Sequence, residues 1–141
     1  MPACTFFGHR DCPDSIYPTL LDTIEGLILS NGVDRFYVGH QGHFDALALK
    51  ALRELKKQHP EIAYHVVLAY LPQRPLPYDP EETLYPEGLE TVPPRFAISR
   101  RNDWMLDRAE YAITYVGVSF GGAAAAIQKA RKKGRILINL Y

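Results

Sequence analysis

A glycine, a histidine and an arginine stand together directly after an apolar run near the start of the chain. Gly8, His9 and Arg10 follow residues 3–7, which predict a buried strand. A guanidinium can hold a phosphate through two parallel hydrogen bonds, and an imidazole could donate to a phosphate or a ribose. His9 as a cap on the sheet and Arg10 in a surface ion pair would explain the same residues without a ligand. We favour the ligand interpretation.

Two glycines near residue 120 offer a second place for an anion. Gly121 and Gly122 precede an alanine-rich helix predicted at residues 123–133, and Ser119 adds a hydroxyl donor. Small residues let a ligand approach backbone N–H groups, and a helix N-terminus favours negative charge. A tight turn that needs glycine for its geometry alone is the alternative.

A third polar turn follows the strand predicted at residues 33–38. It contains Gly39 and Gly42, and Asp45 lies near the start of the next helix. Asp45 could cap that helix or accept a hydrogen bond from a sugar hydroxyl. The sequence leaves both roles open, with capping the simpler explanation.

The histidines and cysteines do not form a recognised metal site. His40 and His43 are three residues apart without a clear third and fourth ligand, and Cys4, His9 and Cys12 lack a zinc-type spacing. The two cysteines are typical of reduced thiols in a cytoplasmic protein. No catalytic triad, cysteine–histidine pair or carboxylate pair is visible in the sequence. We therefore expect no metal, no cofactor and no assignable catalytic residue.

The elements that must position these turns alternate between strand and helix. This alternation predicts an α/β fold, a Rossmann-like three-layer sandwich with a five-stranded, mostly parallel sheet in the order 3-2-1-4-5. The predicted strands are residues 3–7, 33–38, 62–70, 111–116 and 136–140, and the predicted helices are about 15–31, 44–59, 95–108 and 123–133.

In such a sheet a ligand lies outside the carboxyl ends of the strands, where the strand order reverses. With the order 3-2-1-4-5 the reversal falls between the first and fourth strands. The turns at residues 8–10 and 118–122 would then meet at one ligand site.

A long excursion interrupts the pattern between the third strand and the third helix. Residues 71–94 contain seven prolines, and long ordered loops in compact domains are often functional lids. Its glutamates Glu81, Glu82 and Glu87 are expected to be solvated.

Composition indicates one domain over residues 1–141 with a sizeable core. The chain is 47% apolar, and its 16 basic and 16 acidic residues give a formal net charge of zero. A general electrostatic attraction to nucleic acid or to an acidic membrane is therefore not favoured. No apolar run approaches the roughly 20 residues of a membrane span, and the N-terminus does not resemble a signal peptide.

Four segments in order, CTFFGHRDCP, GHQGHFDALAL, RFAISRRNDWML and YVGVSFGGAAAAIQKARKKGRILINL, resemble the SLOG superfamily. That superfamily unites the Lonely-guy phosphoribohydrolases with the DprA/Smf domain, and the likeness is greatest to its small YpsA-like bacterial members. The resemblance covers essentially the whole chain. It implies a Rossmann-like fold, a nucleotide or nucleotide-derived ligand and, often, a homodimer. The alanine-rich helix could pack against a second copy or against its own sheet.

The resemblance also assigns residues to the site. Gly8, His9 and Arg10 match the opening motif of the small members, and Gly39, Gly42 and Asp45 match the glycine and aspartate positions of the segment after the second strand. Arg101 looks like the arginine that Lonely-guy enzymes carry in the helix before their glycine motif. Gly121 and Gly122 look like the glycine pair of that motif.

This sequence departs from the Lonely-guy motif after the glycine pair. Phe120 replaces its proline, and Ile127 and Gln128 stand where its two glutamates would be. The usual catalytic carboxylate is therefore missing. We expect binding or sensing of a phosphate-bearing nucleotide-type ligand. The alternative is an enzyme acting on an N-glycosidic bond, with Asp45 or a loop glutamate as its carboxylate. A nucleic-acid partner, by analogy with DprA, is disfavoured by the zero net charge.

Overall fold

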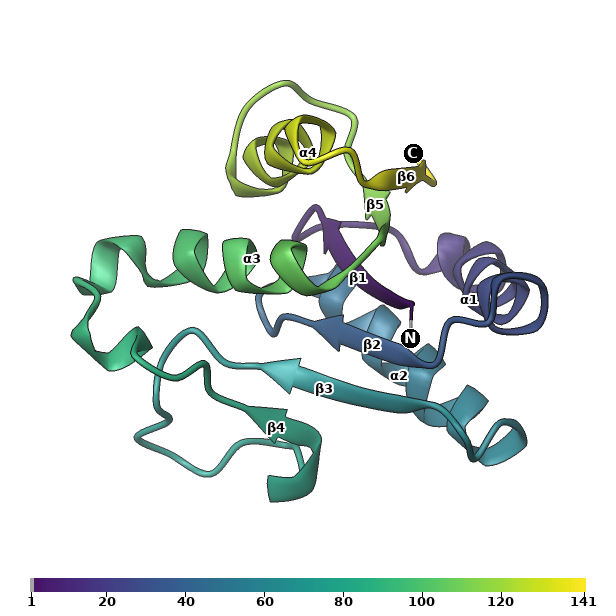
Figure 1. The fold of residues 1–141 in the computed structure, drawn as a ribbon, viewed down its shortest axis with the longest axis horizontal. Coiled ribbons are helices and arrows are strands. Elements are labelled where there is room, and N and C mark those ends of the chain that lie inside the picture. Colours follow the sequence, from purple (N-terminus) through teal and green to yellow (C-terminus); the bar gives the residue numbers. More distant parts are fainter. Residues whose placement is uncertain (1) are drawn as a thin grey trace.

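The computed structural model describes residues 2–141 as one parallel sheet with helices on both faces (Figure 1). The sheet has six strands in the order β4-β3-β2-β1-β5-β6, and all neighbouring strands pair in parallel. The strands are β1 (Ala3–Gly8), β2 (Arg35–Val38), β3 (Ala63–Val67), β4 (Thr83–Leu84), β5 (Tyr111–Tyr115) and β6 (Ile136–Asn139), and the helices are α1 (Tyr17–Asn31), α2 (His43–Gln58), α3 (Ala97–Arg108) and α4 (Gly122–Lys132).

The predicted five-stranded sheet and its order are wrong for the complete sheet. The additional strand β4 lies inside the excursion and pairs with β3, with Thr83 opposite Val66 and Leu84 opposite Val67. The five predicted strands correspond to β1, β2, β3, β5 and β6, and their relative order is β3-β2-β1-β5-β6. A strand of two residues between prolines is too short to produce a periodic pattern, so the sequence does not reveal it.

Alternate residues of β1 pack into two hydrophobic clusters, one on each face of the sheet. Phe6 packs with side chains of α1 and α2 on one face of the sheet, including Leu20 and Leu52. Phe7 packs with side chains of α3 and α4 on the other face, including Met105. This alternation is the two-residue period of a strand buried on both sides. It fixes β1 at the centre of the sheet, where its carboxyl end meets turns from both neighbouring strands.

The alanine-rich face of α4 packs against its own sheet. Ala126 and Ala130 are buried and lie in the same cluster as Ala3 and Ala112 of the strands. Small side chains let a helix approach a sheet closely, so this packing accounts for the alanines without a second copy. Among residues 2–141, no helix combines the length and apolar character needed to cross a lipid bilayer.

The excursion is tied down by a buried carboxylate. Glu82 accepts two hydrogen bonds from Arg53 of α2, both 2.8 Å long, and a third of 2.6 Å from the Tyr64 hydroxyl of β3. The Arg53 hydrogen bonds lower the pKa of Glu82 to about 2. The expectation that Glu82 is solvated is therefore wrong, whereas Glu81 is exposed. These bonds attach residues 79–84 to the sheet and allow β4 to form.

We expect Glu82→Gln to lower the free energy of unfolding at pH 7 by about 1–3 kcal/mol. The substitution removes a charged acceptor of four hydrogen bonds, because the Asp79 backbone N–H also donates to Glu82, at 3.0 Å. The folded pKa of Glu82 lies below its ordinary value of 4.5. Its contribution is therefore present above pH 4.5 and is lost as the pH falls toward 2. Urea denaturation at pH 7 and pH 3 measures both effects. The exposed neighbour variant Glu81→Gln should leave stability unchanged, and equal effects of the two variants would contradict the proposed anchor.

Candidate functional site

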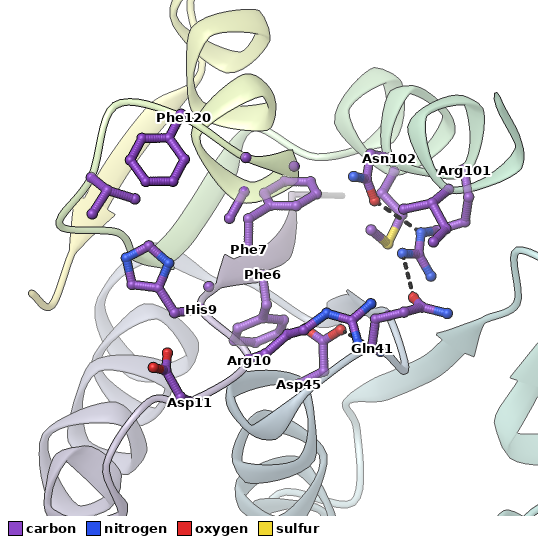
Figure 2. A pocket seen from close by; sticks show the side chains of 18 residues that line it. Phe6, Phe7, His9, Arg10, Asp11, Gln41, Asp45, Arg101, Asn102 and Phe120 are labelled. Atoms are coloured by element: carbon purple, nitrogen blue, oxygen red, sulfur yellow. Dashed lines mark hydrogen bonds between the residues drawn. The ribbon is translucent and has the colours of Figure 1, made fainter. Parts of the chain in front are cut away.

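A cavity of about 460 Å³ opens at the carboxyl ends of the central strands (Figure 2). Its walls come from the end of β1 and the following turn, the turn after β2, one face of α3 and the start of α4. This is the point where the connections from β1 and β5 diverge, as the predicted reversal of strand order requires. Eight of the ten residues expected at a site line the cavity: Gly8, His9, Arg10, Gly39, Asp45, Arg101, Gly121 and Gly122.

The two other expected residues, Gly42 and Ser119, are not among the lining residues. Gly42 is the residue before α2 and has φ +96°, and a Cβ atom there would lie 2.7 Å from the Cα atom of Arg10. It therefore lets the start of α2 pack against the main chain of Arg10. Ser119 is exposed in the turn before α4.

Arg101 is buried and already bonded to protein groups. Its side chain is 3% exposed. Its Nη1 donates to the Val67 carbonyl oxygen at 2.9 Å, and its Nη2 donates to Gln41 Oε1 at 2.7 Å. Its Nε donates to Asn102 Oδ1 at 2.9 Å. Arg101 thus joins the end of β3 to the turn after β2, a role that holds the cavity wall in place.

Arg10 differs from Arg101 in every one of these respects. Arg10 is exposed, and its guanidinium has no hydrogen-bond or ion-pair partner in the described part of the chain. Figure 2 shows its side chain extending along the cavity toward Asp45. A planar cation held at a cavity wall without a partner is suited to bind an anion.

Asp45 is a buried carboxylate beside both arginines. The Gln41 backbone N–H donates to Asp45 Oδ2 at 3.0 Å. A Cβ atom on Gly39 would lie 2.9 Å from both this oxygen and Arg101 Nη1, so glycine permits their approach. Burial raises the pKa of Asp45 to about 6, although Arg101, the Gln41 N–H and Arg10 all act to lower it. Asp45 therefore stabilises the turn before α2 and also lines the cavity.

We expect Asp45→Asn to raise the free energy of unfolding at pH 8 by about 1–3 kcal/mol, because it removes a buried charge and keeps an acceptor for Gln41. The folded pKa of about 6 exceeds the ordinary value of 3.8. The folded protein therefore holds this proton more tightly, and stability falls as the pH rises from about 4 to 6. The gain should vanish at pH 3.5 in urea denaturation. Asp22→Asn, at an exposed position of α1, is the control, and destabilisation of Asp45→Asn at pH 8 would refute the assignment.

His9 lines the cavity but uses one ring nitrogen to hold the neighbouring turn. Its Nε2 accepts a hydrogen bond of 2.8 Å from the Gly117 backbone N–H. The rings of Tyr115 and Tyr141 approach its imidazole edge-on. Since Nε2 is an acceptor, neutral His9 carries its proton on Nδ1. His9 therefore couples the turn after β1 to the turn after β5.

The start of α4 presents backbone donors to the cavity. Gly121 precedes the helix with φ +96° and ψ 174°, and no side chain caps the helix. Gly122 and Ala123 are the first two helical residues, and both line the cavity. The first amide groups of a helix have no intrahelical acceptor, and the helix dipole favours an anion beside them.

The two histidines considered as metal ligands have separate partners. His43 Nε2 lies 2.5 Å from Asp14 Oδ1. His40 Nε2 lies 3.4 Å from the Ala69 backbone nitrogen and 3.2 Å from Gln41 Nε2. Burial, assisted by Arg101, lowers the pKa of His40 to about 4. Within residues 2–141 there is no group of three or more histidine, cysteine or acidic side chains that could hold a metal ion.

Several lining residues were not anticipated from the sequence. The polar ones are Asp11, Gln41 and Asn102, and the apolar ones are Phe6, Phe7, Ile98, Met105, Val118, Phe120 and Ala123. Gln41 lies between two glycines that were singled out, so the turn itself was a usable signal. Asn102 had no such signal, because residues adjacent in a helix rarely face the same site.

Comparison with known proteins finds a likeness in three dimensions. No protein-family model matches the sequence, and no curated protein matches it. The X-ray structure of DNA processing protein A (DprA) from Streptococcus pneumoniae aligns with a TM-score of 0.72 and 17% sequence identity. The alignment covers 99% of this chain and 50% of the DprA chain, so this chain spans about half the length of DprA. The protein thus shares a Rossmann-like α/β fold with this DprA structure.

Proposed function

We propose that the protein binds a nucleotide or nucleotide-derived phosphate ligand in this cavity. One observation carries the proposal: the unpartnered guanidinium of Arg10 and the uncapped start of α4 line the same cavity. A cation with a planar donor pair and a helix N-terminus are two independent features that favour a phosphate. The resemblance of the sequence to small YpsA-like members of the SLOG superfamily supports the same ligand class.

The remaining walls suit the less polar part of such a ligand. Phe6, Phe7 and Phe120 line the cavity, and its volume of about 460 Å³ falls within the usual range for small-molecule sites. Phe120 is 75% exposed, so its ring is accessible for contact with a flat base. The zero net charge of the chain favours a small ligand over a nucleic-acid strand.

The test is a binding panel of AMP, ADP, ADP-ribose, NAD and other nucleoside monophosphates, with adenosine as the ligand without phosphate. Thermal shift reports binding, and chromatography of the same samples reports cleavage. We expect saturable stabilisation by at least one phosphate-bearing compound, no comparable effect of adenosine and no product. A panel without any stabilisation would refute the proposal.

A second candidate function rests on Asp45. A carboxylate that is 8% exposed, lines the cavity and has a pKa of about 6 could stabilise an oxocarbenium-like centre or transfer a proton. This would make the protein a phosphoribohydrolase or a deoxyribosyltransferase-like enzyme. Release of free base that is lost in Asp45→Asn, with nucleotide binding retained, would favour this function over binding alone.

A further inference from the structure

The orientation of the Asn102 side chain is fixed by its neighbour. Arg101 Nε lies 2.9 Å from one end of the Asn102 amide. An arginine nitrogen can only donate, so the facing atom must be the amide oxygen. Figure 2 shows the Asn102 oxygen turned toward Arg101 and its nitrogen turned away. The direction of the amide therefore follows from chemistry.

The amide nitrogen of Asn102 has no acceptor in the described part of the chain. The residue is 8% exposed and lines the cavity. Among residues 2–141 this nitrogen is not one of the fully buried side-chain atoms that lack a partner, so it is open to the cavity, where an acceptor from a bound molecule can reach it. Asn102 thus offers two N–H groups that an acceptor in the cavity would satisfy.

A second set of unpaired donors lines the same cavity. The first backbone N–H groups of α4, at Gly122 and Ala123, have no side-chain cap. Neither of these two donor groups, which lie on separate helices, has an acceptor within residues 2–141. A ligand group with several acceptor oxygens could accept hydrogen bonds from both. An anionic phosphate has this property.

We propose that Asn102 donates to the anionic group of the ligand beside the start of α4, and that Arg101 is a positioning residue that sets the direction of the Asn102 amide. This inference rests on the proposed function and refines it. Arg10 supplies the positive charge, Asn102 and the α4 backbone supply neutral directed donors, and Arg101 does not touch the ligand.

The variant Asn102→Asp separates this role from a structural one. A carboxylate retains an oxygen for Arg101 Nε but replaces the donating nitrogen with a second, negatively charged acceptor. We expect the affinity for AMP to fall at least about 10-fold, with unchanged affinity for adenosine and undiminished thermal stability. Asn31→Asp adds the same charge at an exposed position of α1 and should bind AMP as the wild type does.

A spectroscopic measurement on the wild-type protein tests the contact directly. The side-chain amide signal of Asn102 in a ¹⁵N–¹H spectrum is assigned by its absence in Asn102→Asp. It should shift on saturation with AMP or with inorganic phosphate, and Arg101→Lys should abolish that shift.

The outcomes distinguish this inference from the proposed function. The assignment of Asn102 is wrong if Asn102→Asp binds AMP like the wild type, or if the amide signal does not shift at saturating AMP. If Arg10→Ala loses AMP binding in the same experiments, the proposed site remains. If the wild type binds no member of the nucleotide panel, both fail together.

Discussion

Arg10→Ala is expected to weaken AMP binding about 100-fold, the effect of removing a charged pair of hydrogen bonds to a phosphate. The reason is the division between the two arginines at the cavity. Arg101 is hydrogen-bonded to Val67, Gln41 and Asn102, whereas the Arg10 guanidinium has no such partner among residues 2–141. Titration calorimetry at fixed pH and salt measures the change, and adenosine should bind both proteins equally.

The control for Arg10 is Arg35→Ala. Arg35 is exposed at the first residue of β2, at the opposite end of the strands from the cavity. Both variants lower the net charge by one, so a general electrostatic effect would reduce AMP affinity equally in both. A selective loss in Arg10→Ala supports a local contact. Undiminished AMP binding by Arg10→Ala would remove the principal argument for an anion site.

The largest expected effect on stability is that of Gly42→Ala. Gly42 has φ +96°, and the new Cβ would lie 2.7 Å from the Arg10 Cα atom. Backbone strain of about 1–3 kcal/mol is then added to a clash of about 1–3 kcal/mol with this main-chain atom, which cannot rotate away. Urea denaturation should show a loss of about 3 kcal/mol or more in the free energy of unfolding.

Two other glycines separate these contributions. Gly121 has nearly the same backbone angles as Gly42, but a Cβ there meets nothing within 4 Å. Gly121→Ala should therefore show only the strain, about 1–3 kcal/mol. Gly26 lies in α1 with open space and no positive φ, so Gly26→Ala should raise stability by about 0.5–1 kcal/mol. A Gly42→Ala variant no worse than Gly121→Ala would exclude the clash.

The fold could be predicted where apolar runs are long enough to be buried on both sides. The pattern around Phe6 and Phe36 identifies central strands, and the chain order of strands and helices then limits the topology. β4 could not be found in this way. Its formation depends on Glu82 meeting Arg53, which lies 29 residues away, and no local pattern expresses such a pairing.

The candidate site could be predicted only in part, because sequence gives residue type and not burial. It placed Arg10 and Arg101 together as ligand residues, whereas one is exposed and the other is 3% exposed and hydrogen-bonded. It also passed over Asn102, whose exposure to the cavity follows from the packing of α3. The glycines could be identified because positions with positive φ or close backbone approach favour glycine over other residues.

Helix α2 follows β2 and helix α4 follows β5, and β2 and β5 are the two neighbours of β1 in the sheet. The residues before these helices have the same φ, but the first amide groups of the helices are satisfied differently. Gly42 before α2 and Gly121 before α4 share φ +96°. At α2 the first amide, that of His43, donates to the Arg10 carbonyl oxygen at 2.9 Å. This peptide oxygen accepts the hydrogen bond that a bound anion could accept at α4. The main chain of Arg10 thus satisfies one helix while its side chain remains available to the cavity. A displacement of Arg10 would therefore alter both the start of α2 and the cavity.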